Sequence, residues 1–205
     1  MASDERPETN RQETGPDSGP VKQGSSGASG CSGCGTWFLW ALACTAGTGL
    51  GWALGWRLSF AGPGYLGIWV IGLVTGAILG VCQALILRPF LKSSGRWVLA
   101  TIFGWMLGFY LGAELAANLG LTELVFGVVT GGGVGLVLGM VQWLVLRTRF
   151  RGAGWWVLAN TLAWLGGMMA YLPGANAMGL IYGAAAGILT GWVLMGLTAG
   201  VLAKE

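Results

Sequence analysis

The chain has 205 residues, of which 54% are hydrophobic and only 9% are charged. Soluble domains usually carry about 25% charged residues, so this composition indicates a protein that lies in lipid. The sequence contains no histidine, which excludes serine–histidine catalytic triads and histidine metal ligands. A net charge of +3 is too small to indicate nucleic-acid binding, and we expect none.

A polar segment precedes the apolar part of the chain. Residues 1–36 are rich in Gly, Ser, Pro and charge, and they lack hydrophobic periodicity. Such a segment buries too little apolar surface to offset the entropy of ordering, so we expect a disordered cytoplasmic tail. The pair Cys31 and Cys34 supplies two thiols, whereas a structural zinc site takes four ligands. We therefore expect no metal, unless two chains share the site, and no cofactor.

Six apolar stretches follow the tail, and each is close to the length that crosses a bilayer, about 20 residues. Turn residues or charges separate them. They are 37–57, 65–87, 97–117, 124–146, 155–172 and 179–202. This pattern predicts an all-α integral membrane protein with six transmembrane helices in one domain, residues 37–202.

The basic residues divide unevenly between the two sides of a six-span arrangement. Ten of the eleven Lys and Arg residues fall in the tail, in the 88–96 and 147–154 loops, or at the C-terminus. Only Arg57 falls on the other side. Because cytoplasmic loops carry an excess of Lys and Arg, we expect both termini to be cytoplasmic in a bacterial inner (plasma) membrane.

Two sequence blocks recur at an offset of 59 residues. GAILGVCQALILR (76–88) returns as GLVLGMVQWLVLR (135–147), and WVLATIFGWMLG (97–108) returns as WVLANTLAWLGG (156–167). Weaker echoes occur near Trp37 and Gly183. The pattern predicts a helical hairpin used three times, over about 37–88, 97–147 and 155–202. Hairpins of two spans all point the same way, so we expect a pseudo-threefold bundle.

Glycines recur every four residues along most of the predicted helices, so each series lies on one helix face. Glycine faces let helix backbones approach closely in lipid, where van der Waals contact drives association. The packing positions that we single out are Gly76, Gly80, Gly131, Gly135, Gly139, Gly183 and Gly187. The alternative is that such stripes line a pore.

Polar residues inside the membrane are candidates for function. Gln83 and Gln142 precede the end of their helices by similar distances, and Thr101 and Asn160 follow the start of theirs. The repeat therefore predicts one polar layer, which either joins helices by hydrogen bonds or binds a neutral solute or a cofactor head group. Glu114 is the only acid within a predicted span, and it is a candidate for proton or cation handling.

The twelve tryptophans are typical of residues that anchor helices at the membrane interface. They predict two aromatic belts. The cytoplasmic belt comprises Trp37, Trp40, Trp97, Trp155 and Trp156, and the outer belt comprises Trp52, Trp56 and Trp69.

Both Gln residues open a Q-x-L-x-L-R helix end, over Gln83–Arg88 and Gln142–Arg147, and Trp156–Ala159 opens a tryptophan-led helix. In these motifs residues 37–202 resemble a loose group of uncharacterised bacterial multi-pass membrane proteins. The resemblance implies the fold and the compartment, and it implies no activity.

The sequence contains no Walker loop, metalloprotease helix or Gly-x-Ser-x-Gly elbow, so we expect no enzyme. We favour a non-catalytic subunit or scaffold that packs through its glycine faces against a protein partner or a second copy. The main alternative is a small transporter or channel for a neutral or small solute. A pigment- or quinone-binding protein, with tryptophans stacked on the ligand, is a further alternative.

Overall fold

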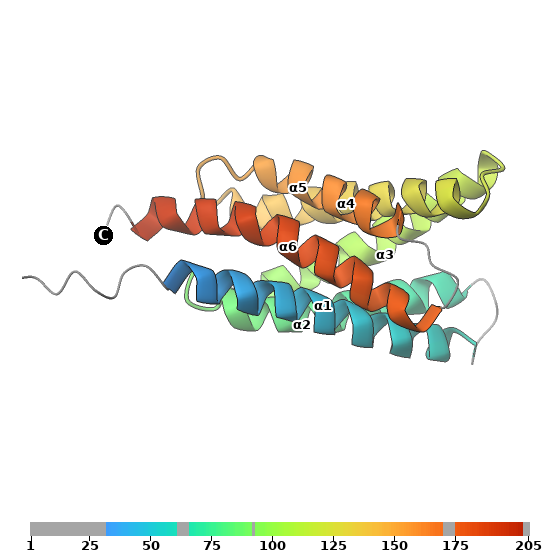
Figure 1. Ribbon diagram of the computed structural model, residues 1–205, viewed down its shortest axis with the longest axis horizontal. Helices are drawn as coiled ribbons and strands as arrows, with labels where there is room; N and C mark the ends of the chain where they lie inside the picture. Colours follow the sequence, from blue (N-terminus) through green and yellow to red (C-terminus); the bar gives the residue numbers. More distant parts are fainter. Residues whose placement is uncertain (1–31, 61–65, 92, 170–174, 203–205) are drawn as a thin grey trace, which may run out of the picture.

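The computed structural model describes residues 32–60, 66–91, 93–169 and 175–202. Every regular element within these ranges is a helix (Figure 1). The helices are α1 (Ser32–Ser59), α2 (Gly67–Leu87), α3 (Ser94–Asn118), α4 (Glu123–Leu146), α5 (Trp155–Met169) and α6 (Ala175–Leu202). The prediction of an all-helical chain is confirmed for the residues described.

Five of these helices, all except α5, are long and apolar enough to cross a membrane. The chain is therefore a multi-pass membrane protein. Helix α5 has 15 residues, which gives a length of about 22 Å, and the hydrocarbon core is about 30 Å thick. The described part of the fifth predicted span, 155–172, is helical up to Met169, and residues 170–174 lie outside those described.

The described part of helix α1 begins at Ser32, five residues before the predicted start at Trp37. The Ser-Gly-Cys-Gly-Thr segment, which the sequence places in the tail, forms its first turns. Cys34 consequently lies in the first turn of α1, where it is exposed. Cys31 and the rest of the predicted tail, residues 1–31, lie outside the described residues.

The six helices form a closed ring. Each helix packs against its neighbours in chain order, and α6 packs against α1. The start of α1 and the end of α6 lie at the same end of the bundle, on the left in Figure 1. The α2–α3 and α4–α5 connections lie there too, with Arg88, Arg96, Arg147, Arg149 and Arg151. We call this the basic end.

Glycines hold neighbouring helices at short range. A Cβ atom on Gly76 of α2 would lie 2.8 Å from the Cα of Ile102 in α3, and one on Gly135 of α4 would lie 2.7 Å from the Cα of Thr161 in α5. Real Cβ atoms do not approach backbone this closely, so only glycine fits. An added Cβ would also lie less than 3.0 Å from the backbone of a neighbouring helix at Gly47, Gly51, Gly72, Gly104, Gly108, Gly112, Gly131, Gly133, Gly183 and Gly187, and 3.0 to 3.2 Å from it at Gly55, Gly80, Gly139 and Gly179.

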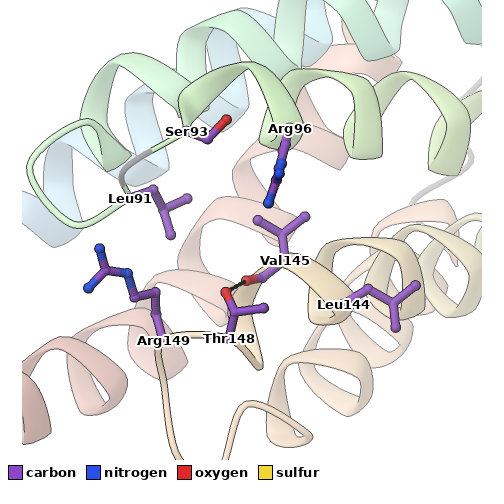
Figure 2. Close-up of a pocket in the computed structure, with 7 residues that line it drawn as sticks. All are labelled: Leu91, Ser93, Arg96, Leu144, Val145, Thr148 and Arg149. Carbon is purple, nitrogen blue, oxygen red and sulfur yellow. Dashed lines mark hydrogen bonds between the residues drawn. The ribbon is translucent and has the colours of Figure 1, made fainter.

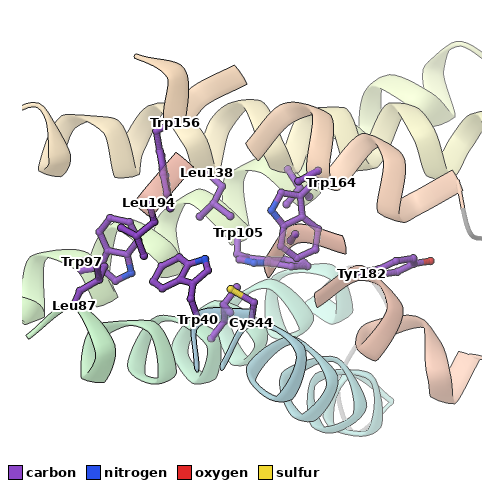
Figure 3. Close-up of a cluster of buried hydrophobic side chains, with 14 of the residues drawn as sticks. Trp40, Cys44, Leu87, Trp97, Trp105, Leu138, Trp156, Trp164, Tyr182 and Leu194 are labelled. Atoms are coloured by element: carbon purple, nitrogen blue, oxygen red, sulfur yellow. The ribbon is translucent and has the colours of Figure 1, made fainter. Parts of the chain in front are cut away.

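Large side chains fill the middle of the ring (Figure 3). Residues four apart on α1, α3 and α5 point inward over several turns, beginning with Trp40, Trp97 and Trp156 and ending at Trp52 on α1. The first three tryptophans are at most 1% exposed, and Trp52 is 9% exposed. The prediction that these four belong to interfacial belts is wrong, because their four-residue spacing to buried neighbours places them on the inward faces. Trp155 and Trp56 are exposed, at 68% and 42%.

Candidate functional site

The four predicted polar-layer residues are all buried in the ring. Gln83 lies on α2, Thr101 on α3, Gln142 on α4 and Asn160 on α5, and none is more than 5% exposed. The Nε2 of Gln142 donates a 3.0 Å hydrogen bond to Oγ1 of Thr101 and a 3.4 Å bond to Oε1 of Gln83. Asn160 instead donates to the carbonyl of Trp156, at 3.1 Å. The structure therefore joins three of the four side chains directly.

Tryptophans complete the hydrogen bonding of both glutamines. The indole N–H of Trp97 donates to Oε1 of Gln83 at 3.1 Å, and that of Trp156 donates to Oε1 of Gln142 at 2.9 Å. The Nε2 of Gln83 donates to Sγ of Cys44 on α1, at 3.2 Å. Both side-chain amides are thus satisfied by groups of the chain itself, which is how buried polar groups are normally stabilised.

A triangle of indoles covers the polar layer on its basic side. Trp40, Trp97 and Trp156 contact one another edge to face, with ring centroids 5.8 to 6.2 Å apart. Such T-shaped pairs stabilise beyond the burial of their area. Trp40 donates a 2.9 Å hydrogen bond to Oγ1 of Thr190 on α6. We call Trp40, Trp97 and Trp156 the indole triangle.

The rest of the core differs from the polar layer. Five buried polar atoms have no hydrogen-bond partner within the part of the chain described. They are Oγ1 of Thr48, Thr75 and Thr130 and Nε1 of Trp52 and Trp105. They lie on α1 to α4, farther from the basic end than the polar layer. We call them the unpaired cluster.

The buried threonines of the unpaired cluster contrast with other threonines of the bundle. Thr45, Thr101, Thr161, Thr190 and Thr198 each donate to the carbonyl four residues earlier. In lipid an unsatisfied polar group costs several kcal/mol. Sequence reasoning did not identify this cluster, although all five of its members keep the four-residue spacing of the inward faces.

Glu114 lies apart from both groups. It is exposed on α3, one turn before the end of the helix, and its backbone carbonyl accepts a 2.8 Å hydrogen bond from Nδ2 of Asn118. Glu114 therefore lies on the outer surface of the ring, away from the buried polar layer.

The described residues contain no group of three or more Cys, Asp or Glu side chains that could hold a metal ion. Cys44 is buried and Cys82 is half-buried, and each lies within a helix. The predicted pairing of Cys34 with Cys31 falls partly outside the described residues.

No family model matches the chain, and no curated protein or solved structure is significantly similar to it.

Proposed function

We propose that this protein is a non-catalytic subunit or scaffold of the plasma membrane, with both termini in the cytoplasm. One observation carries the proposal: the amides of Gln83 and Gln142 bond to groups of the chain itself. A solute site needs polar groups that can turn to the solute. Side chains that already satisfy one another beneath a closed indole triangle are better suited to hold a rigid helical frame.

The same contacts support a threefold arrangement of hairpins. Trp97 bonds to Gln83 as Trp156 bonds to Gln142, and the members of each pair are 14 residues apart. The third tryptophan, Trp40, bonds to Thr190. We propose that residues 37–88, 97–147 and 155–202 are repeated hairpins, joined by glycine faces and by these bonds.

The glycine stripes bear on which face of the ring is free to bind a partner. From the sequence, the glycine faces pack either the bundle itself or a partner. In the structure the stripes meet neighbouring helices of the same chain, so they are occupied inside the ring. A partner therefore contacts the outward face, where α3 carries a row of large residues four apart. This row comprises Leu99, Phe103, Leu107, Leu111 and Leu115, exposed by 44 to 61%.

The test begins in intact membranes. Single cysteines replace Leu107 and Leu111 on the outward face of a chain in which the four native cysteines are changed to serine, and Ala163→Cys serves as the control because Ala163 is buried. A short homobifunctional or photoactivated thiol cross-linker is added before gentle detergent purification and mass spectrometry. We expect one stoichiometric adduct from the outward positions and none from Ala163→Cys. Recovery of the chain alone from every position would contradict the subunit proposal.

A second function is favoured by the unpaired cluster. Hydroxyl and indole groups without partners could bind a small neutral molecule, which suits the alternative of a transporter or channel for such solutes. Flux of water, urea and glycerol into proteoliposomes tests it directly. A pigment or quinone stacked on the indole triangle is less favoured, because the three indoles already contact one another.

A further inference from the structure

A cavity of about 490 Å³ opens at the basic end, between the start of α3 and the end of α4 (Figure 2). Neither the polar layer nor the indole triangle contributes to its lining. Its walls combine two arginines, hydroxyl groups and aliphatic side chains. This combination fits a ligand with a charged head and an apolar tail.

Arg96 and Arg149 supply the charge. Arg96 lies in the first turn of α3, and Arg149 follows the end of α4. The acidic residues of the described helices are Glu114 and Glu123, which flank the α3–α4 connection at the opposite end. Within the described part of the chain, the two guanidinium groups therefore face the cavity without a carboxylate to neutralise them. Arginine binds phosphate through paired N–H donors in a planar fork.

The beginning of α3 adds backbone donors. Ser93 occupies the N-cap position, yet its side chain makes no capping hydrogen bond, and the first turn of α3 contains no acidic residue. The first N–H groups of a helix and its macrodipole favour an anion. The Ser93 hydroxyl also lines the cavity. The start of α3 therefore borders the same cavity as the two arginines.

The apolar wall faces the membrane. Leu144, on α4, lines the cavity and is 52% exposed, and Val145 lies beside it. The lining thus passes from guanidinium groups at the loops to aliphatic side chains on the helix surface. A soluble phosphate would use the first part only, whereas a phospholipid would use both.

The internal repeat does not explain this cavity. Arg88 and Arg147 correspond at the 59-residue offset, but the residue 59 after Arg96 is Trp155 and the residue 59 before Arg149 is Phe90. The two cavity arginines are therefore specific to the junction of α3 and α4. If these arginines supported the architecture that the hairpins share, arginines would be expected at the equivalent positions of the other repeat.

We propose that this cavity binds the phosphate group of an anionic phospholipid. Arg96, Arg149 and the start of α3 hold the phosphate, and the acyl chains follow Leu144 along α4. Basic pockets between membrane helices are suited to such head groups. The proposal goes beyond the subunit function and does not depend on it.

The test compares two charge-matched variants of the full chain. R96Q/R149Q removes the cavity arginines, and R88Q/R151Q removes two exposed arginines of the same end that do not line the cavity. Each protein is reconstituted in nanodiscs of phosphatidylcholine with phosphatidylglycerol, and retained lipids are counted by native mass spectrometry. We expect the wild-type chain and R88Q/R151Q to retain phosphatidylglycerol selectively. The preference should fall about tenfold or more in R96Q/R149Q.

Equal losses in both variants would overturn the site, because the attraction would then be diffuse charge at the basic end. No preference in the wild-type chain would overturn it as well. A second arm titrates inorganic phosphate into lipid-free protein in neutral detergent. Binding of phosphate that R96Q/R149Q abolishes, without lipid selectivity, would keep the phosphate site but reject the phospholipid. Circular dichroism of each variant checks that the helices are intact.

Discussion

The indole N–H of Trp156 donates a 2.9 Å hydrogen bond to Oε1 of Gln142, fourteen residues earlier in the chain. This bond joins α4 to α5, and the bond from Trp97 to Gln83 likewise joins α2 to α3. Both therefore connect one proposed hairpin to the next. The bond from Trp40 to Thr190 connects α1 to α6 and closes the ring. The tryptophans thus join adjacent hairpins to one another by hydrogen bonds.

Gln142→Leu should destabilise the bundle. It removes the acceptor of Trp156 and the donor to Thr101, leaving a buried indole N–H without a partner. An unsatisfied buried group costs about 1 to 3 kcal/mol. Unfolding in mixed detergent and SDS, followed by tryptophan fluorescence, measures the loss. In a Trp156→Phe background the same substitution should cost clearly less, and an equal cost in both backgrounds would show that the two residues are not coupled.

Thr190→Val should weaken the closure of the ring. Valine keeps the shape of threonine but removes the acceptor for the Trp40 indole. We expect a loss of about 1 kcal/mol in the free energy of unfolding. Thr198→Val, on the same helix, is the matched control, because the Thr198 hydroxyl donates only to backbone carbonyls of α6. Similar losses for both variants would contradict a role for Thr190 between helices.

The polar layer shows what sequence can predict here. The 59-residue offset placed Gln83 and Gln142 at equivalent positions, and the hydrogen bond between them spans that same offset. Depth along a helix follows from residue counting alone. The rotation of a helix about its axis depends on its neighbours, and the sequence does not state which helices are adjacent. For this reason the sequence alone predicts interfacial anchors at positions where the structure has inward tryptophans.

The unpaired cluster and the basic cavity are harder to predict, for a related reason. Thr48 and Thr75 look like ordinary threonines of a membrane helix, which usually donate to the carbonyl four residues earlier. Only the geometry shows that their hydroxyls lack this bond. Arg96 and Arg149 are 53 residues apart and were interpreted through topology rules. Their shared cavity depends on how α3 packs against α4.

Gly135→Ala should be far more harmful than Gly132→Ala. A Cβ on Gly135 would lie 2.6 Å from the backbone oxygen of Asn160, whereas one on Gly132 meets only Leu165, at 3.8 Å. Forcing α4 and α5 apart should cost about 1 to 3 kcal/mol. Alanine at 132 should leave stability unchanged or raise it by up to about 1 kcal/mol, because alanine favours helix. The SDS unfolding assay compares them, and equal effects would argue against close packing at 135.

The orientation of the bundle is tested with thiol reagents that do not cross membranes. A cysteine at Glu123 marks the end opposite the basic end, and the native Cys34, exposed in the first turn of α1, marks the basic end. The distribution of Arg and Lys predicts that Glu123→Cys is labelled from outside intact cells. Cys34 should be labelled only in inverted vesicles. Labelling of Glu123→Cys solely from the cytoplasm would reverse the proposed topology.

Two single variants, Thr75→Val and Thr101→Val, distinguish the scaffold function from the transporter function. The Thr75 hydroxyl has no partner among the described residues, so its removal should not destabilise the chain and should raise the free energy of unfolding by about 1 to 3 kcal/mol. Thr101 accepts from Gln142, and Thr101→Val should destabilise because that amide loses the nearer of its two acceptors. If the chain is a scaffold, neither variant changes the permeability of proteoliposomes in stopped-flow light scattering. A solute flux in the wild-type chain that Thr75→Val abolishes, with the fold intact, would assign the unpaired cluster to transport.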